Sequence, residues 1–372
     1  MRFLHTADWQ IGMKAAHAGQ AAAQVREERL ASARRVVEAA REASAEFIVV
    51  AGDTFEDNGV ERVLIQRVAD ILASFGGPVY IIPGNHDPFV PGSVWEHPAW
   101  KAAANVHVLV SEEPVEVPGG LLFPCPLREV HADRDPTAWV RVAGQTGIKI
   151  GLAHGSVEGI VLEEPDYPIP RDAAERAGLD YVALGHWHST GTYPDGDGAV
   201  RLAYSGTHEQ TKFGERDSGN ALVVDISGPG APPDVRPVRV GRLNWLIEEA
   251  ELREAGDLVR LRSQVEAIPE PAATLVEVRL RGVLSADDEP ELRHLEDILA
   301  ARFLLGRLDA SALVPSPADD VWLASLPAGV IRLAAERLRD MAQSAGPKAI
   351  PAPEVISRAL LELYALSKEA AR

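Results

Sequence analysis

Five short apolar segments of the sequence each run directly into a small cluster of polar residues, and no other feature constrains the fold as strongly. The clusters are Asp8-Trp9-Gln10, Gly52-Asp53-Thr54-Phe55-Glu56, Gly84-Asn85-His86-Asp87, His154-Gly155 and Gly185-His186-Trp187-His188. The apolar segments read as buried strands. Because sites in open α/β sheets form beyond the carboxyl ends of the strands, we expect the five clusters to meet in one place.

The residues of these clusters are of metal-binding types. Asp, Asn and neutral His supply oxygen and nitrogen ligands that suit manganese, iron or zinc. Taken singly, each cluster has a simpler interpretation, since an Asp after a strand often caps a helix, a His often packs inside, and Gly-Asn-His-Asp favours a turn. The recurrence of such residues after five separate strands favours one shared metal site over five unrelated structural roles.

The first hundred residues alternate between strands and helices. Apolar strands are predicted at 3–7, 47–51 and 79–82, with amphipathic helices at 21–44 and 58–75 between them. This alternation predicts a parallel sheet with right-handed crossovers.

Beyond residue 105 short strands dominate, and they predict a second, mixed sheet packed on the first. These strands are expected at 106–110, 121–123, 148–153, 181–184, 200–204 and 221–226. The predicted fold class is therefore α/β, with two packed mixed β-sheets flanked by helices in four layers.

A turn-rich segment at 227–233 interrupts this pattern. Two helices and two strands follow, and they predict a small α+β unit with helices at 252–267 and 289–302 and strands at 273–281 and 303–309. The rest of the chain is predicted to be helical in two pieces, divided at 346–353. We therefore expect three domains, at 1–235, 236–316 and 317–372.

Composition narrows the class of protein further. Cys125 is the single cysteine, so no intrachain disulfide and no cysteine-based zinc site can form, which is typical of a cytoplasmic protein. No apolar run reaches the roughly 18 residues of a membrane span, and the first residues do not resemble a signal peptide. The net charge of −18 argues against a protein that coats nucleic acid by bulk charge, but not against an enzyme that contacts it locally.

The order of the clusters resembles the DxH, GDxxD, GNHD, H and GHxH motifs of the calcineurin-like metallophosphoesterases. More narrowly, the chain resembles the SbcD-like DNA repair exonucleases. The narrower resemblance rests on the segments Leu4–Trp9, Pro83–Asp87, Ala183–His188, Tyr204–Thr207 and Phe213–Glu215. It covers about residues 1–240, and the α+β unit resembles the capping domain of that family. The resemblance implies a metallophosphoesterase sandwich that hydrolyses DNA phosphodiester bonds.

The resemblance also implies two divalent metal ions. Manganese is the favoured metal, with iron, zinc or magnesium as alternatives. Asp53 would bridge the two ions. Asp8, Gln10 and His188 would complete the first site, and Asn85, His154 and His186 would complete the second. His86 would bind no metal but would stabilise or protonate the departing oxygen, with Asp87 orienting its ring.

Two residues depart from the family motifs. Gln10 stands where the motif has His, and because a Gln carbonyl is a weaker ligand than an imidazole, we expect the first metal to bind less tightly. Glu56 replaces the last Asp of GDxxD and is expected to contact the metal ligands without binding the metal itself, with Asp57 as the alternative. The other expected ligands are intact, so we expect an active enzyme.

Several aromatic residues and one histidine lie beside the motifs. Trp9 and Trp187 are expected to pack beneath the site, with stacking on a nucleotide base as the alternative. The loop that carries Trp95 and Trp100 could be anchored to the core or contact DNA. His208 is expected at the surface.

The C-terminal tail carries apolar residues at helical spacing. Its two helices could pack on their own domain or dock on a partner by one apolar face. The resemblance favours docking on the coiled coil of an SbcC-like ATPase, and it also implies pairing of two copies through the phosphoesterase domain. We expect DNA as substrate and no membrane contact. Two other functions stay open: a metallophosphoesterase acting on a small phosphoester, and a non-catalytic scaffold with a weakened first metal site.

Overall fold

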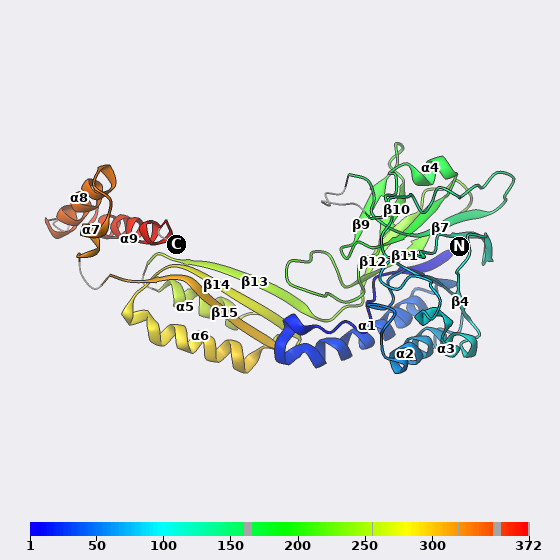
Figure 1. The fold of residues 1–372 in the computed structure, drawn as a ribbon, viewed down its shortest axis with the longest axis horizontal. Helices are drawn as coiled ribbons and strands as arrows, with labels where there is room; N and C mark the ends of the chain where they lie inside the picture. Colours follow the sequence, from blue (N-terminus) through cyan, green and yellow to red (C-terminus); the bar gives the residue numbers. More distant parts are fainter. Residues whose placement is uncertain (160–165, 255, 318–319, 345–350, 371–372) are drawn as a thin grey trace. The chain divides into compact units, whose positions relative to one another are not determined.

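A computed structural model describes residues 1–159, 166–254, 256–317, 320–344 and 351–370 (Figure 1). The chain divides into two compact units, Met1–Leu243 and Asn244–Arg372. The first unit contains all five polar clusters, and we call it the catalytic unit; the second we call the C-terminal unit. The finer division into a cap and a tail stays a prediction.

The first sheet of the catalytic unit has six strands, in the order β12-β11-β1-β2-β3-β4. The four strands β1 to β4 run parallel, and β11 and β12 extend the sheet antiparallel beside β1. Their bounds are β1 Arg2–Thr6, β2 Phe47–Ala51, β3 Val79–Ile82, β4 Val106–Val108, β11 Asn220–Asp225 and β12 Asp234–Arg239. The central strands are apolar throughout because both faces of the sheet are covered.

Three helices cover the outer face of this sheet: α1 Ala22–Glu42, α2 Arg62–Ala73 and α3 Pro98–Ala102 (Figure 1). One face of α1 is apolar, and its Val25, Leu30 and Val36 are buried against the sheet. Helix α2 ends shortly before Gly76, whose φ of 84° is in the left-handed region that favours glycine. Short 3₁₀ turns lie at Ala16–Ala21, Val94–Glu96, Pro271–Ala273 and Ala286–Asp288.

The second sheet also has six strands, in the order β5-β6-β7-β8-β10-β9. Strands β6, β7, β8 and β10 are parallel to one another, and β5 and β9 are antiparallel at the edges. Their bounds are β5 Val115–Val117, β6 Gly120–Pro124, β7 Ile148–His154, β8 Tyr181–Gly185, β9 Gly191–Pro194 and β10 Val200–Tyr204, and the helix α4 spans Ala173–Ala177. Parallel strand pairs thus make up most of this sheet.

The two sheets pack face to face around a buried apolar layer. Phe3 and Phe47 stack with ring centroids 5.0 Å apart, and Tyr181 of the second sheet meets Phe3 edge-on at 5.8 Å. Strand β2 faces β7 and β8 across this layer. The predicted fold class is therefore confirmed: two packed mixed sheets flanked by helices.

Two expected strands belong to a different sheet from the one predicted. The sequence pattern places the segments 106–110 and 221–226 in the second sheet, but β4 pairs with β3 and β11 pairs with β1 in the first. The pairing of β11 joins Leu4 to Val223, more than two hundred residues along the chain. Hydrophobic periodicity identifies a strand but not its partner, so this error is one of long-range pairing.

The C-terminal unit contains a three-stranded parallel sheet in the order β13-β14-β15. The strands are β13 Asn244–Leu252, β14 Thr274–Leu284 and β15 Leu305–Pro315, connected by the helices α5 Asp257–Glu266 and α6 Glu289–Arg302. The α+β composition agrees with the prediction, whereas β13 is not predicted and β15 begins later than expected. Leu258, Val276 and Leu295 belong to the core of this part.

Three further helices complete the C-terminal unit: α7 Trp322–Ser325, α8 Val330–Ser344 and α9 Pro353–Glu369. The break expected at 346–353 lies partly outside the described residues, which resume at 351. The ring of Trp322 packs edge-on against Tyr364 at 4.9 Å and joins α7 to α9. Among the described residues, no helix is long and apolar enough to cross a membrane.

Candidate metal centre

The seven expected metal ligands lie at the ends of five strands that come from both sheets. Asp8 and Gln10 follow β1, Asp53 follows β2, Asn85 follows β3, His154 ends β7, and His186 and His188 follow β8. The parallel directions of β1, β2 and β3, and of β7 and β8, bring these ends to the same side of their sheets.

Asp8, Asp53 and His154 form the centre of the site. One ligand atom from each lies within 4.8 Å of the others, and all three residues are at most 2% exposed. The Nε2 atom of His154 is 3.4 Å from Oδ2 of Asp53. Two carboxylates and an imidazole buried this close together form a site that favours a cation.

Asn85 and His186 lie against this trio. Oδ1 of Asn85 is 2.8 Å from Nε2 of His154 and 3.2 Å from Nδ1 of His186. The structure thus brings together Asp8, Asp53, Asn85, His154 and His186. Asp8 also accepts hydrogen bonds from the backbone N–H of His186, at 2.9 and 3.1 Å.

The hydrogen bond of His154 to the backbone determines which of its nitrogens can bind metal. Nδ1 lies 2.8 Å from the carbonyl oxygen of Ala51, which can only accept, so Nδ1 carries the proton. In the neutral ring Nε2 therefore presents a lone pair toward the oxygens of Asp53 and Asn85. With the ring neutral, these three electron-rich atoms face one another and suit a divalent cation. Without a cation, a proton on Nε2 lets His154 donate to the two oxygens instead.

Four of the expected ligands have unusual backbone conformations, which determine the direction of their side chains. Asp8, Gln10, Asp53 and His186 have φ angles of 54°, 41°, 48° and 107°, in a region that residues other than glycine rarely adopt. Such conformations are typical of functional sites, where the surrounding structure maintains them. Gly84 is also required, because a Cβ there would lie 2.1 Å from Oδ1 of Asp53.

The electrostatics of the trio reflect its burial. Burial raises the pKa of Asp8 to about 6, although His154 and His188 pull it down. Burial alone would lower the pKa of His154, but the adjacent Asp53 carboxylate outweighs burial and raises that pKa to about 9. Burial opposes ionisation of Asp53, yet His154 keeps the pKa of Asp53 below its ordinary value. Without a metal, the protein compensates the buried carboxylates with a protonated histidine.

Gln10 and His188 occupy the edges of the site. The backbone N–H of Gln10 donates to the carbonyl oxygen of Asp53 at 2.9 Å, but no hydrogen bond of its side chain is found within the described ranges. Nδ1 of His188 lies 2.9 Å from Oε1 of Glu215. Because the carboxylate of Glu215 accepts a hydrogen bond from Nδ1–H, Nε2 of His188 is left as the metal-binding nitrogen. Gln10 is therefore held through the backbone of Asp53, and His188 through the side chain of Glu215.

His86 is exposed, in contrast to the buried ligands. Its backbone N–H donates to Asp53 at 2.9 Å, and its Nδ1 donates to the carbonyl oxygen of Glu56 at 3.0 Å. Nε2 is therefore the nitrogen available to a substrate. Glu56 acts through its backbone, so the replacement of Asp by Glu does not alter this contact.

The role expected for Asp87 is wrong. Its carboxylate accepts from the backbone N–H groups of Gly84 and Phe55, at 2.7 and 2.9 Å, and it is fully buried. The Nδ1 atom of His86 binds Glu56 instead. Asp87 holds the β3 loop against the β2 loop, because a buried carboxylate pairs with the nearest free N–H groups.

Arg29 is a residue that sequence reasoning missed. It is 1% exposed, and its guanidinium group donates to the carbonyl oxygens of Asp8, Trp9 and Glu209. Burial lowers the pKa of Arg29 to about 10, so it remains charged at neutral pH. It ties the Asp8–Gln10 loop to the segment 207–209. An arginine on a helix rich in Arg and Glu looks like a solvent-facing residue, and no local signal marks it.

The neighbouring aromatic residues are structural. Trp9 is fully buried, and its ring packs 5.1 Å from that of His208, which is also fully buried and binds the carbonyl oxygen of Arg29. The expectation that His208 lies at the surface is therefore wrong. Trp95 and Trp100 are buried and stack at 5.5 Å, so they anchor their loop to the core.

A two-sheet sandwich with buried carboxylate and histidine ligands at its strand ends defines a metal-dependent phosphoesterase. Residues 1–190 match the family model of the calcineurin-like phosphoesterases, and the chain belongs to this family. Members of this family use divalent metals, and the trio Asp8, Asp53 and His154 could hold such an ion.

Comparison with known proteins adds two similar chains. The uncharacterized metallophosphoesterase YhaO of Bacillus subtilis is 29% identical over 178 residues, which cover 45% of this chain and 42% of that relative. The match therefore spans less than half the length of the relative. The crystal structure of TT1561 of Thermus thermophilus aligns with a TM-score of 0.41 at 13% identity, over 64% of this chain and 98% of that one.

Proposed function

We propose that this chain is a metal-dependent DNA nuclease of the SbcD-like type, which hydrolyses phosphodiester bonds. The observation that carries the proposal is the pairing of the buried trio Asp8, Asp53 and His154 with the exposed His86. Buried anionic ligands hold cations, and an exposed imidazole beside them can reach a substrate too large to enter a closed pocket.

The ligand set fits two divalent ions, with manganese as the favoured metal. Asp53 would lie between the ions, with Asp8, Gln10 and His188 holding one and Asn85, His154 and His186 holding the other. When bound, such ions neutralise charge on the phosphoryl oxygens and activate water. The chain itself would orient the phosphate through His86, whose Nε2 can give a proton to the departing oxygen when the ring is doubly protonated.

One set of assays tests the nuclease proposal. The full chain with Mn²⁺ is given labelled duplex DNA, single-stranded DNA and bis-p-nitrophenyl phosphate, beside a His86→Asn variant. We expect cleavage of DNA and of the small ester, with both reduced in the variant. Hydrolysis of the small ester alone would show a small-molecule phosphoesterase, and no turnover of any substrate would indicate a scaffold.

The Gln10 position offers a second test of the same site. Gln10→His restores the imidazole of the family motif, so we expect Mn²⁺ to bind about tenfold more tightly, as judged by calorimetry, because imidazole is the better nitrogen ligand. Gln66→His, on the exposed side of α2, is the control. An unchanged affinity in Gln10→His would mean that residue 10 is not a ligand.

We further propose that the C-terminal unit comprises a capping domain at 236–316 and a docking tail at 317–372 for an SbcC-like coiled-coil ATPase. The support is the apolar surface of the tail helices. Val330, Leu333 and Leu366 are 82%, 65% and 60% exposed, although the same helices bury Ala335 and Tyr364 against one another. Exposed apolar patches of this kind mark interaction sites.

The partnership is tested by co-elution of the full chain with the coiled-coil segment of the ATPase. We expect the double variant Leu333→Glu and Leu366→Glu to lose co-elution while keeping its nuclease activity. Co-elution that survives the double variant would place the partner elsewhere. Sedimentation of the chain alone tests the further expectation that two copies pair.

A further inference from the structure

A groove of about 510 Å³ opens between α1, α2 and the loop that follows Gln10, and we call it the α1/α2 groove. Its wall includes Ile11, Gly12 and Lys14 of the ligand-bearing loop, Arg26 of α1 and Arg67 of α2. The groove lies within the catalytic unit, and apart from Arg29, which also lines it, its residues have no role in the metal centre described above.

The groove adjoins the metal centre through the backbone. The loop 8–11 runs beside the loop 52–56, joined by hydrogen bonds from Gln10 N–H to Asp53 O at 2.9 Å and from Ile11 N–H to Thr54 O at 2.9 Å. Ile11 returns the contact by accepting from Glu56 N–H at 3.0 Å. The residue after a proposed metal ligand is thus a wall of the groove, which brings the groove next to the metal centre.

The groove has positively charged groups that are not neutralised within it. Arg67 is paired with Glu27 at 3.0 Å. In contrast, Lys14 and Arg26 are exposed, and no ion pair of either is found among the described residues. In the described part of the chain, the one hydrogen bond of the Arg26 side chain goes to the carbonyl oxygen of Lys14, at 3.0 Å. Apart from Arg29, which is buried and donates to backbone carbonyl oxygens, the lining carries three cations and three carboxylates, so its charge is balanced in a chain of net charge −18.

The floor of the groove is apolar. Ile11 and Leu30 are each 2% exposed and line it from below, together with Val60 and Leu64. Gly12 has a φ of 104°, and a Cβ there would lie 2.4 Å from Val60. The glycine therefore lets the loop lie close to α2. An apolar floor with free cations at the rim matches a nucleotide, which has a flat apolar face and an anionic phosphate.

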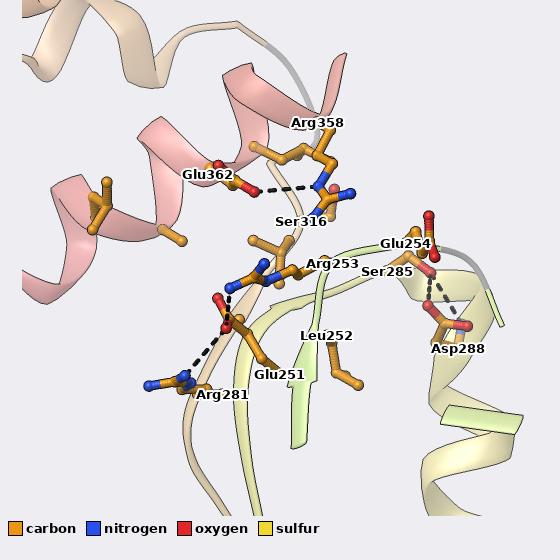
Figure 2. A pocket seen from close by; sticks show the side chains of 15 residues that line it. Glu251, Leu252, Arg253, Glu254, Arg281, Ser285, Asp288, Ser316, Arg358 and Glu362 are labelled. Carbon is orange, nitrogen blue, oxygen red and sulfur yellow. Dashed lines mark hydrogen bonds and ion pairs between the residues drawn. The ribbon is translucent and has the colours of Figure 1, made fainter. Parts of the chain in front are cut away.

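A second cavity, of about 450 Å³, lies in the C-terminal unit and shows the opposite arrangement. Figure 2 shows Arg253 and Arg281 both directed at Glu251, and Arg358 directed at Glu362. These guanidinium groups are already paired with carboxylates at 2.6 to 3.2 Å. The number of arginines is therefore similar in both cavities, but only the α1/α2 groove has cations without carboxylate partners among the described residues.

We propose that the α1/α2 groove binds the nucleotide next to the scissile phosphodiester, with Lys14 and Arg26 contacting its phosphate. This inference rests on the proposed nuclease function, and it names where the substrate strand continues. It also explains how a strongly acidic protein holds DNA: the metals bind one phosphate and a local pair of cations binds the next. A small phosphoester ends before the groove and makes no use of it.

The test compares two substrates in the full chain with Mn²⁺. The double variant Lys14→Glu and Arg26→Glu is measured on a single-stranded oligonucleotide and on bis-p-nitrophenyl phosphate. We expect kcat/KM for the oligonucleotide to fall at least about tenfold more than kcat/KM for the small ester. The slope of log affinity against log salt should also become shallower by about one for each lost contact. Arg34→Glu, an exposed arginine of α1 outside the groove, is the matched control.

The outcomes separate the groove from the nuclease proposal. If the wild type cleaves DNA and kcat/KM of the double variant falls by the same factor on both substrates, the groove proposal is overturned and the nuclease proposal stands. If the wild type hydrolyses only the small ester, the nuclease proposal fails, and fluorescence anisotropy of a labelled oligonucleotide tests the groove alone. Weaker binding by the double variant than by Arg34→Glu then supports the groove, and equal binding refutes it.

Discussion

The two units of this chain differ in the side chains that they place in an energetically unfavourable environment: one buries charged groups, and the other exposes apolar groups. The catalytic unit buries charge, since Asp8, Asp53 and His154 are at most 2% exposed. The C-terminal unit exposes apolar surface, since Val330 and Leu333 of α8 are 82% and 65% exposed. Burial of an ionised carboxylate is costly unless it is paired, and exposed apolar area forgoes about 25 cal/mol per Å².

The difference indicates what each unit binds. A buried anionic cluster becomes favourable when a cation enters it, whereas an exposed apolar helix face becomes favourable when another apolar surface covers it. Both features lower the stability of the free chain relative to its bound forms. The four predictions that follow test whether these are binding sites, from the largest expected effect to the smallest.

Removing the charge of Asp53 should have the largest effect. Asp53→Asn keeps the size of the side chain and can still accept from the N–H of His86, but a neutral amide is a poorer ligand for a cation than a carboxylate. Because residues that only support metal ligands already contribute about 10–100-fold, we expect hydrolysis of bis-p-nitrophenyl phosphate to fall more than about 100-fold. Steady-state kinetics and Mn²⁺ calorimetry measure this loss. Asp70→Asn, an exposed carboxylate of α2, is the control, and equal activity of the two variants would refute the site.

Arg29 should affect metal affinity because it holds the Asp8–Gln10 loop in place. Arg29→Met removes the donors to the carbonyl oxygens of Asp8, Trp9 and Glu209. We expect Mn²⁺ affinity to fall about 10–100-fold, as for other residues that orient metal ligands, and Arg29→Lys to restore part of it.

The control for Arg29 lies on the same helix. Arg35 donates to Val240 O at 2.6 Å and pairs with Glu28 at 2.7 Å, and within the described part of the chain it makes no hydrogen bond to the Asp8–Gln10 loop. Arg35→Met should lower thermal stability and leave metal affinity unchanged. If both variants weaken Mn²⁺ binding equally, Arg29 supports the fold in general and does not position the ligands.

These residues show which parts of the site can be predicted from sequence. The clustering of Asp8, Asp53 and His154 is predictable because each lies at or just after the end of an apolar strand, a local pattern. The burial of Arg29 and His208 depends on contacts across nearly 180 residues, which no local pattern encodes. The role expected for Asp87 rests on its proximity in the sequence to His86, but free N–H groups of two loops bind its carboxylate. The pairing of β11 with β1 escapes prediction for the same reason, since a strand pattern does not specify its partner.

Asp8 gives a pH-dependent test of the metal-free protein. Its native pKa of about 6 lies above the ordinary value of 3.8, so the native state binds this proton more tightly than the unfolded state does. Stability should therefore decrease as the pH rises between these two values. Asp8→Asn removes this loss and should be more stable at pH 7 by on the order of 3 kcal/mol. Urea unfolding with a chelator at pH 4, 5, 6 and 7 measures it.

The sign of the Asp8 effect distinguishes two roles for this residue. If Asp8 stabilises the metal-free chain, its replacement should lower the free energy of unfolding. If Asp8 is a metal ligand that is buried without its metal, its replacement should raise the free energy of unfolding. Added Mn²⁺ should then stabilise the wild type and not Asp8→Asn. A variant that is less stable than the wild type at pH 7 without metal would contradict the view of Asp8 as a strained ligand.

The smallest effect should come from the exposed leucines of the tail. Leu333→Glu and Leu366→Glu change side chains that are 65% and 60% exposed, and Glu forms helices about as well as Leu. Each should alter the free energy of unfolding by no more than about 0.5 kcal/mol. Leu323→Ala, in the buried cluster of the same unit, should lower it by about 2–5 kcal/mol. Denaturant unfolding compares the three variants, and a loss above about 1 kcal/mol for Leu333→Glu would mean that the free chain itself covers this face, leaving no surface there for a partner.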